Sequence, residues 1–379
     1  MSITARLLGS VRLPGGEALV NGFAFEGRAG AARRAQLPNG HELDVYDLDD
    51  LLAGERAPVA VFPAPWKGWG RGVDSVSPDG TFAVFSGQRA VRAVDADGAT
   101  LWEYRHGCWG SEIGHPHTGD EQQVCSGLEH GSCRVSDDGR LVWAHVTEGD
   151  GDAWQEVWVV LDARDGRELA RLPLEDSAAS GSYHVSHPDG VHMGLGIGMG
   201  QDGCLVYWGR WDGERLTTWD LNEGLDRVLF DVHPGHAGFL TMEHYGADLQ
   251  LHALDGTVLS EAPPPDPDRA DGAGDEDGDE GDYQDEDGPE VPEGWDWSAG
   301  FVDADTVIAC TGLEYGEEEF PRHWLLDAHT LEIRGAVRYP SGRTEGYARP
   351  LGDGTWLTYA RSDEALSRWG TAPRTPETS

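Results

Sequence analysis

The stretch Val91-Arg92-Ala93-Val94-Asp95-Ala96-Asp97-Gly98-Ala99-Thr100-Leu101-Trp102 decides the fold of this chain. It is an apolar run that ends in Asp, followed by a turn and a second apolar run. Because a single hairpin cannot bury an apolar face in water, we expect such repeats to be four-stranded units that pack on one another. Versions of the pattern end at Asp47, Asp95, Asp162, Asp220, Asp255 and Asp327, and we expect this Asp to close the third strand of each unit.

These units predict an all-β fold, a seven-bladed β-propeller, with six or eight blades as the fallback. Asp-Gly turns between the first and second strands mark the blades, most clearly in Val73–Phe85 and Cys133–Trp143. Residues 15–63 form a less regular unit, and only about three strands remain after residue 343. We therefore expect the N-terminal run Ile3–Leu8 to join the last blade and close the ring, which removes open sheet edges.

We expect a single propeller domain over residues 1–370, because propellers run long as one domain. Residues 261–294 contain fifteen acidic residues, one Arg and almost nothing apolar. Such a segment cannot offset the entropy cost of ordering, so we predict a disordered acidic insertion between blades. Residues 371–379 are predicted to be a flexible tail.

The net charge is −40, from 28 Lys and Arg against 68 Asp and Glu. This charge repels phosphate backbones and anionic membranes, so we expect no nucleic-acid and no membrane partner; solubility is a sufficient reason for it. The first residues contain no segment long enough for an export signal or a membrane span, so we expect a cytoplasmic protein and a monomer. Five cysteines favour reduced thiols or metal ligands over a disulfide framework.

Residues Ala93–Trp102 resemble the repeat of quinoprotein-type propellers, in which an Ala, an Asp, a Gly and a Trp docked between blades recur in that order. Leu161–Leu169 is similar, with Ala170 where the Trp would stand. Trp219-Asp220 resembles the closing dipeptide of WD-repeat blades. The resemblance implies a fold and no activity. Quinoprotein dehydrogenases of this fold are typically exported, so we do not expect their quinone cofactor, PQQ, in this chain.

The stretch from His106 to Cys133 contains seven of the chain's twenty His and Cys residues. Two thiolates and two imidazoles from this stretch would suit Zn²⁺, although their spacing lacks the close Cys-x2-Cys pair of a standard finger. Glu112 is a candidate general base on a metal-bound water. The alternative is a surface loop whose histidines make ordinary hydrogen bonds. The candidate metal ligands are Cys108, His115, His117 and Cys125.

A second group of polar residues stands near the starts of successive units. Asp74, Arg134 and His184 occupy nearly equivalent places, so we expect them to converge on the central channel. A channel mouth of this kind suits an anionic or carbonyl-bearing ligand, or a metal, and His184 and His187 are the catalytic candidates there. The alternative is hydrogen-bonded blade ends. The histidines of this group are His184, His187, His192, His233, His236 and His244.

Two functions remain open from the sequence. The first is a non-catalytic cytoplasmic propeller that presents loops and an acidic surface to a protein or small-molecule partner. The second is a lyase or hydrolase that depends on Zn or Mn at the channel mouth. The alternating run Gly194–Gly200 is expected to be a strand packed closely on a neighbour, because the strand-to-helix context of a phosphate cradle is missing.

Overall fold

The structure is a computed structural model, and almost all of its described residues lie in strands and tight turns. Within them the helices are α1 (Leu48–Leu52) and the 3-10 helix η3 (Gly200–Asp202), so the predicted all-β class is confirmed. No helix in this part of the chain has the length and apolar character that a membrane span needs. The described residues are 2–13, 24–26, 34–39, 42–66, 74–109, 131–149, 154–174, 177, 179–222, 226–265, 294–311, 321–342, 344, 346–360 and 362–371.

In the described part of the chain, five of the sheets contain four strands each, and in every one the strands are consecutive in the chain and antiparallel. Each sheet is therefore a meander whose first strand lies at one edge. The five sheets are β2 (Ala24–Glu26), β3 (Arg34–Asn39), β4 (Glu42–Asp47) and β5 (Ala60–Pro63); β6 (Asp74–Val76), β7 (Phe82–Ser86), β8 (Ala90–Asp95) and β9 (Thr100–Arg105); β10 (Cys133–Val135), β11 (Leu141–Glu148), β12 (Gln155–Asp162) and β13 (Glu168–Leu174); β14 (Gly181–Ser186), β15 (His192–Gly198), β16 (Cys204–Trp211) and β17 (Leu216–Asp220); and β18 (Arg227–Val232), β19 (Phe239–Glu243), β20 (Leu249–His252) and β21 (Val258–Ala262).

A sixth sheet has eight strands, and β1 (Ser2–Arg12) lies in its middle. Residues 5–12 of β1 pair antiparallel with β28, as the ring-closure prediction required. Residues 2–4 pair in addition with β25, in parallel, so one strand joins the last two blades. The other strands are β22 (Trp295–Asp303), β23 (Thr306–Thr311), β24 (Arg322–Asp327), β25 (Ile333–Arg338), β26 (Arg349–Pro350), β27 (Thr355–Ala360) and β28 (Ala365–Thr371).

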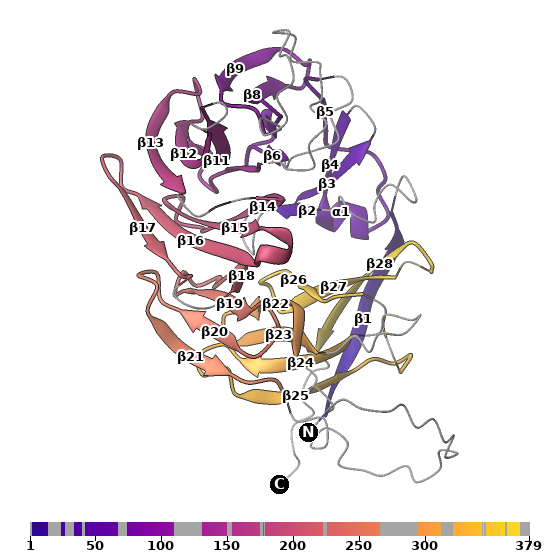
Figure 1. Ribbon diagram of the computed structural model, residues 1–379. Coiled ribbons are helices and arrows are strands. Elements are labelled where there is room, and N and C mark those ends of the chain that lie inside the picture. Colours follow the sequence, from indigo (N-terminus) through magenta and orange to yellow (C-terminus); the bar gives the residue numbers. More distant parts are fainter. Residues whose placement is uncertain are drawn as a thin grey trace.

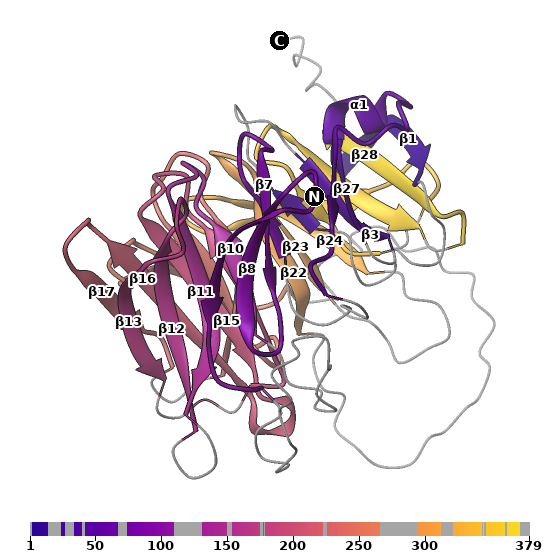
Figure 2. The same cartoon turned by 90° about the horizontal axis from the view of Figure 1, so that it is seen from above.

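The apolar core lies between consecutive blades and not inside any one of them. Figure 1 shows the sheets following one another around a centre, with the first blade beside the last. In Figure 2 the sheet of β10–β13 and the sheet of β14–β17 lie face to face, and one buried cluster fills the space between them. Counted over the described residues there are seven strand quartets, and seven buried clusters each join two neighbouring quartets.

The repeated Asp residues have one physical role, which is to cap a turn. Each of the six accepts a hydrogen bond on Oδ1 from the backbone N–H two residues later, at 2.9–3.1 Å. Asp95 ends the third strand of its blade, as do three of the others. Asp220 instead ends a fourth strand and Asp255 lies within a turn, which corrects the expectation that all six close equivalent strands. The hydrogen bond from the Asp side chain to a nearby backbone N–H is thus made in all six turns, whatever the position of the turn in its blade.

The tryptophan of the quinoprotein-like repeat is docked between blades, as the resemblance implies. Trp102 of β9 donates from Nε1 to the carbonyl of Ala163 in the following blade, at 2.8 Å. Gly166 has φ +70° and lies against the same indole, so that a Cβ there would come within 2.6 Å of Trp102. Residues 194–198 of the Gly-rich run lie in strand β15, as predicted, whereas Gly200 begins η3. The strand packs closely on its neighbour, since a Cβ on Gly194 would meet Leu229 at 2.3 Å.

Candidate functional site at the central channel

A pocket of about 190 Å³ lies among the first strands of five consecutive blades. These strands contact one another in sequence order, so residues far apart in the chain converge on the pocket. Arg134 and His184 line it as predicted, whereas Asp74 is not among its lining residues. The lining consists of Arg134, Asp137, His184, Val185, Ser186, Phe230, Asp231, Phe301, Pro350, Leu351 and Gly352.

Arg134, Ser186 and Asp137 form a short polar chain across the boundary between two blades. Arg134 donates from Nη2 to Ser186 Oγ at 3.3 Å, and Ser186 Oγ donates to Asp137 Oδ1 at 2.6 Å. The Ser186 hydroxyl, on β14, therefore contacts both the Arg134 cation on β10 and the Asp137 anion in the turn after β10. This arrangement holds both charged groups at the pocket wall.

Asp231 ties the next two blades together. Its Oδ1 accepts from the backbone N–H of Val232 and its Oδ2 from that of Phe301, both at 2.8 Å. A carboxylate bound in this way fixes the spacing of β18 and β22 while leaving its negative charge at the pocket. Phe230 and Phe301 provide aromatic surface beside it.

His184, a candidate catalytic residue, has both ring nitrogens engaged. Nε2 accepts from Trp158 Nε1 at 3.0 Å, so the ring proton is on Nδ1, which lies 2.9 Å from Ser132 Oγ. Burial lowers the pKa of His184 well below its ordinary value, and His145 and Arg134 act in the same direction. The imidazole is consequently neutral and structurally held, with no lone pair directed at the pocket.

The predicted Cys/His metal site lies largely outside the described residues. His115, His117, Cys125 and the candidate base Glu112 all fall within residues 110–130, so that site stays a prediction. Cys108 is described and buried, and its carbonyl accepts from Trp154 Nε1 at 3.3 Å. The acidic insertion, apart from its ends at residues 261–265 and 294, also lies outside the described residues, as does the tail beyond residue 371.

His187, the other catalytic candidate, lies in the turn between β14 and β15. Its Nδ1 is 2.9 Å from Asp189 Oδ1, and His192 Nδ1 is 2.7 Å from Asp189 Oδ2. Two imidazoles thus share one carboxylate. Asp189 was not singled out by sequence reasoning, although it stands in an Asp-Gly turn like Asp79 and Asp138 in other blades.

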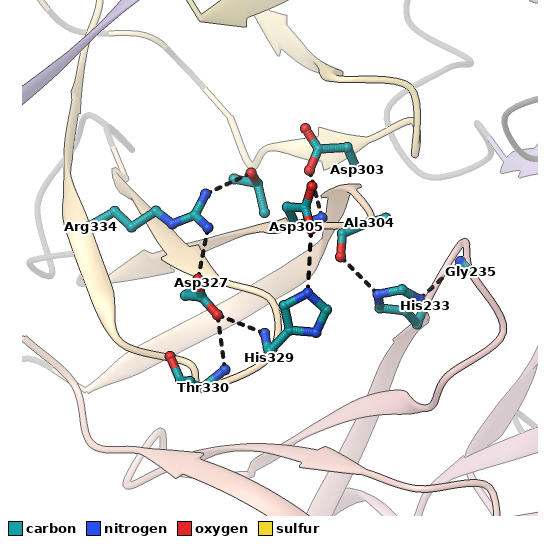
Figure 3. Close-up of polar contacts among 10 residues, drawn as sticks. His233, Gly235, Asp303, Ala304, Asp305, Asp327, His329, Thr330 and Arg334 are labelled. Carbon is teal, nitrogen blue, oxygen red and sulfur yellow. Dashed lines mark hydrogen bonds and ion pairs between the residues drawn. The ribbon is translucent and has the colours of Figure 1, made fainter.

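The ring of His236, from the next blade, lies 5.3 Å from that of His187, whereas His233 and His244 make separate contacts. His233 accepts on Nδ1 from the Gly235 N–H, and its Nε2 lies 2.9 Å from the carbonyl oxygen of Ala304 in the neighbouring blade, as Figure 3 shows. The exposed His329 contacts Asp305 at 3.3 Å in the same view. His244 Nδ1 is 3.7 Å from Cys204 Sγ. The expected convergence therefore holds for part of the group only.

No protein-family model matches the sequence, and no curated protein matches it. Among solved structures, the β-propeller domain of Cps50 (Swd1) from Myceliophteria thermophila is similar, with 12% identity, a TM-score of 0.53, and coverage of 97% of this chain and 100% of that one. The fold is a β-propeller. Two further solved structures match with TM-scores below 0.5: BamB from Moraxella catarrhalis (0.45, 12% identity, 97% of each chain) and the Dos1 propeller (0.44, 10% identity, 76% of this chain and 65% of that one). At these identities the likeness is one of fold alone.

Proposed function

We propose that this chain is a non-catalytic, cytoplasmic β-propeller that binds a protein partner at its central channel. The observation that carries the proposal is the size of the pocket together with its polar lining. A volume of about 190 Å³ holds a side chain, whereas small-molecule sites usually measure about 300–1,000 Å³. A partner that inserts one residue would fill it and leave the rest of the interface on the surrounding turns.

The charges favour a basic side chain as the inserted group. Asp137 and Asp231 line the pocket together with a single guanidinium, that of Arg134, and two phenylalanines. A cation between carboxylates and aromatic rings gains from both kinds of contact. The net charge of −40 adds long-range attraction for a basic partner and speeds encounter.

The state of His184 supports a binding role over an acid–base one. A general base needs a lone pair within reach of the proton that it abstracts, and Nε2 of His184 already accepts from Trp158. Binding, in contrast, uses a fixed wall, which the Trp158–His184–Ser132 chain provides.

The test compares Asp137→Lys with Glu214→Lys, which makes the same charge change on an exposed outer turn. Each protein is used to isolate partners from cells of the source organism, and the partner recovered with wild type is then purified and titrated by calorimetry. We expect Asp137→Lys to weaken its binding at least tenfold, while Glu214→Lys binds as wild type does. Equal binding by all three proteins, each shown to be folded by circular dichroism, would refute the channel as the binding site.

A further inference from the structure

The charged residues of the channel pocket stand on strands of different blades. The first strands of these blades contact one another in the order β10, β14, β18, β22 and β26. Arg134 is on β10 and Asp231 is on β18, so the guanidinium and this carboxylate are two blades apart around the pocket. A ligand that pairs with both must carry opposite charges at two places.

Asp231 is held in place by close packing with the neighbouring blades. A Cβ on Gly300 of β22 would lie 2.8 Å from Asp231 Oδ2 and 2.5 Å from Pro350 Cγ, so only glycine leaves room for this approach. Phe301 donates its backbone N–H to the same carboxylate and also lines the pocket. This side of the pocket therefore offers a fixed negative charge beside apolar surface, which suits a cation on an apolar stem.

Arg134 is not explained by an inserted cation alone. Burial lowers the pKa of His184 and keeps its imidazole neutral, so Arg134 is the one cation among the described lining residues. A Lys or Arg within a partner's sequence brings positive charge only, and like charges repel. Arginine is instead the residue best suited to bind a carboxylate, because its planar fork matches both oxygens.

Asp137 adds a hydrogen-bond acceptor close to Arg134. Ser186 Oγ accepts from Arg134 Nη2 at 3.3 Å and donates to Asp137 Oδ1 at 2.6 Å, so one hydroxyl contacts both charged groups. At the C-terminus of a peptide, the carboxylate and the amide N–H of the last residue are attached to the same carbon atom. This carboxylate and N–H are complementary to a guanidinium and a carboxylate that lie side by side.

We propose that the partner enters the pocket with its C-terminal residue, and that this residue is Arg or Lys. Its carboxylate binds Arg134, its amide N–H donates to Asp137, and its side-chain cation binds Asp231 beside Phe301. A pocket of about 190 Å³ has room for one residue, and a chain that ends there needs no path out. The inference rests on the proposed function, because it names the group that the channel binds.

Three peptides separate the contributions of the two charges. Acetyl-Gly-Gly-Arg with a free carboxylate carries both charges, its C-terminal amide carries the cation alone, and acetyl-Gly-Gly-norleucine with a free carboxylate carries the anion alone. Each peptide is titrated into the full chain by calorimetry. We expect the arginine acid to bind wild type at least about tenfold more tightly than either of the others, because each of those lacks one charge-assisted pair.

Two arginine variants locate the carboxylate. Arg134→Gln removes the positive charge and keeps a side-chain N–H donor for Ser186. Arg215→Gln makes the same change on an exposed outer turn and is the matched control. We expect Arg134→Gln to bind the acid and the amide about equally, while Arg215→Gln keeps the wild-type preference. Circular dichroism checks that both variants are folded.

The outcomes distinguish this inference from the proposed function. Equal binding of the acid and the amide by wild type overturns the inference, as does a preference that Arg134→Gln retains, or no binding of any peptide. Free arginine, in which an α-ammonium replaces the amide, is a fourth probe; if it binds more tightly than the acid peptide, the pocket belongs to a free amino acid and the inference is wrong. The proposed function is judged separately, by Asp137→Lys and the purified partner.

Discussion

His252 is a buried histidine that the fold holds neutral. It lies in β20, where its Nε2 is 2.7 Å from Thr241 Oγ1 and its Nδ1 is 3.2 Å from the Gly256 carbonyl. Burial lowers its pKa to about 4, more than the contact with Gly256 raises it. An unfolded chain takes up the proton near pH 6.5 and the folded chain only near pH 4, so stability is lost as the pH falls between these values.

We therefore expect His252→Gln to reduce the pH dependence of folding. The loss of unfolding free energy between pH 7.5 and pH 5 should be smaller than in wild type by about 2 kcal/mol. Urea titrations at the two pH values measure it. Leu249→Val, in the same buried strand, controls for destabilisation without a titrating group. An equal pH dependence in wild type and His252→Gln would show that this imidazole does not stay neutral in the folded state.

Some residue roles could be read from the sequence and others could not. The Asp of the repeat was visible because an Asx turn is local, with donor and acceptor two residues apart. The state of His184 was not, since its partners Trp158 and Ser132 come from another blade and only the register of three strands brings them together. The pairing of His187 with His236 has the same origin, a contact between turns of two blades.

At the scale of elements, neighbouring blades pack through close contacts in which a tryptophan lies against a glycine, as Trp102 does against Gly166. Gly166→Ala adds a Cβ at φ +70° that meets Trp102 at 2.6 Å. Gly200→Ala adds one at φ +65° with nothing within 4 Å. We expect the second change to cost about 1 kcal/mol of unfolding free energy from backbone strain alone, and the first to cost about 2–4 kcal/mol because the indole must also move. Equal losses of unfolding free energy for the two variants, measured by chemical denaturation, would show that the interface between the blades accommodates the added Cβ without a further cost.

The strand that joins the last two blades makes a second prediction at this scale. Ala5 of β1 is buried in the cluster between these blades, whereas Thr4 beside it is exposed. Ala5→Asp places an unpaired charge in that cluster and should cost more than about 3 kcal/mol. Thr4→Asp, with the same change in charge, should cost less than about 1 kcal/mol. Urea unfolding measures both, and light scattering reports sheet edges exposed by an open ring. Similar stabilities of the two variants would contradict closure by β1.

The ring closure itself was predictable from the sequence, since the last unit lacked a strand and Ile3–Leu8 could supply one. The parallel pairing of Ser2–Thr4 with β25 could not be predicted, because the residue pattern of a strand does not show which strand lies along its other edge. The same holds for the boundaries of the fourth blade, where Asp220 suggested a third strand and ends a fourth.

At the scale of the whole molecule, the chain has a net charge of −40. Repulsion among so many like charges opposes compaction, and salt screens it over a Debye length that falls from about 30 Å at 0.01 M to about 8 Å at 0.15 M. We expect the thermal unfolding midpoint to rise by several degrees over this range of NaCl. A flat or falling midpoint, followed by scanning calorimetry, would mean that local ion pairs such as Arg227–Asp248 outweigh the net repulsion.

The double pairing of β1 has a consequence for biosynthesis. Ser2–Arg12 leaves the ribosome before its antiparallel partner β28, which is translated about 350 residues later, a delay of tens of seconds at about 5–20 residues per second. Until β25 and then β28 have emerged, its backbone donors and acceptors have no native partner, and the blades that follow it form an open arc. The nascent polypeptide therefore completes its architecture only after β28 has emerged, and chaperones that shield an unpaired strand would have their longest opportunity at β1.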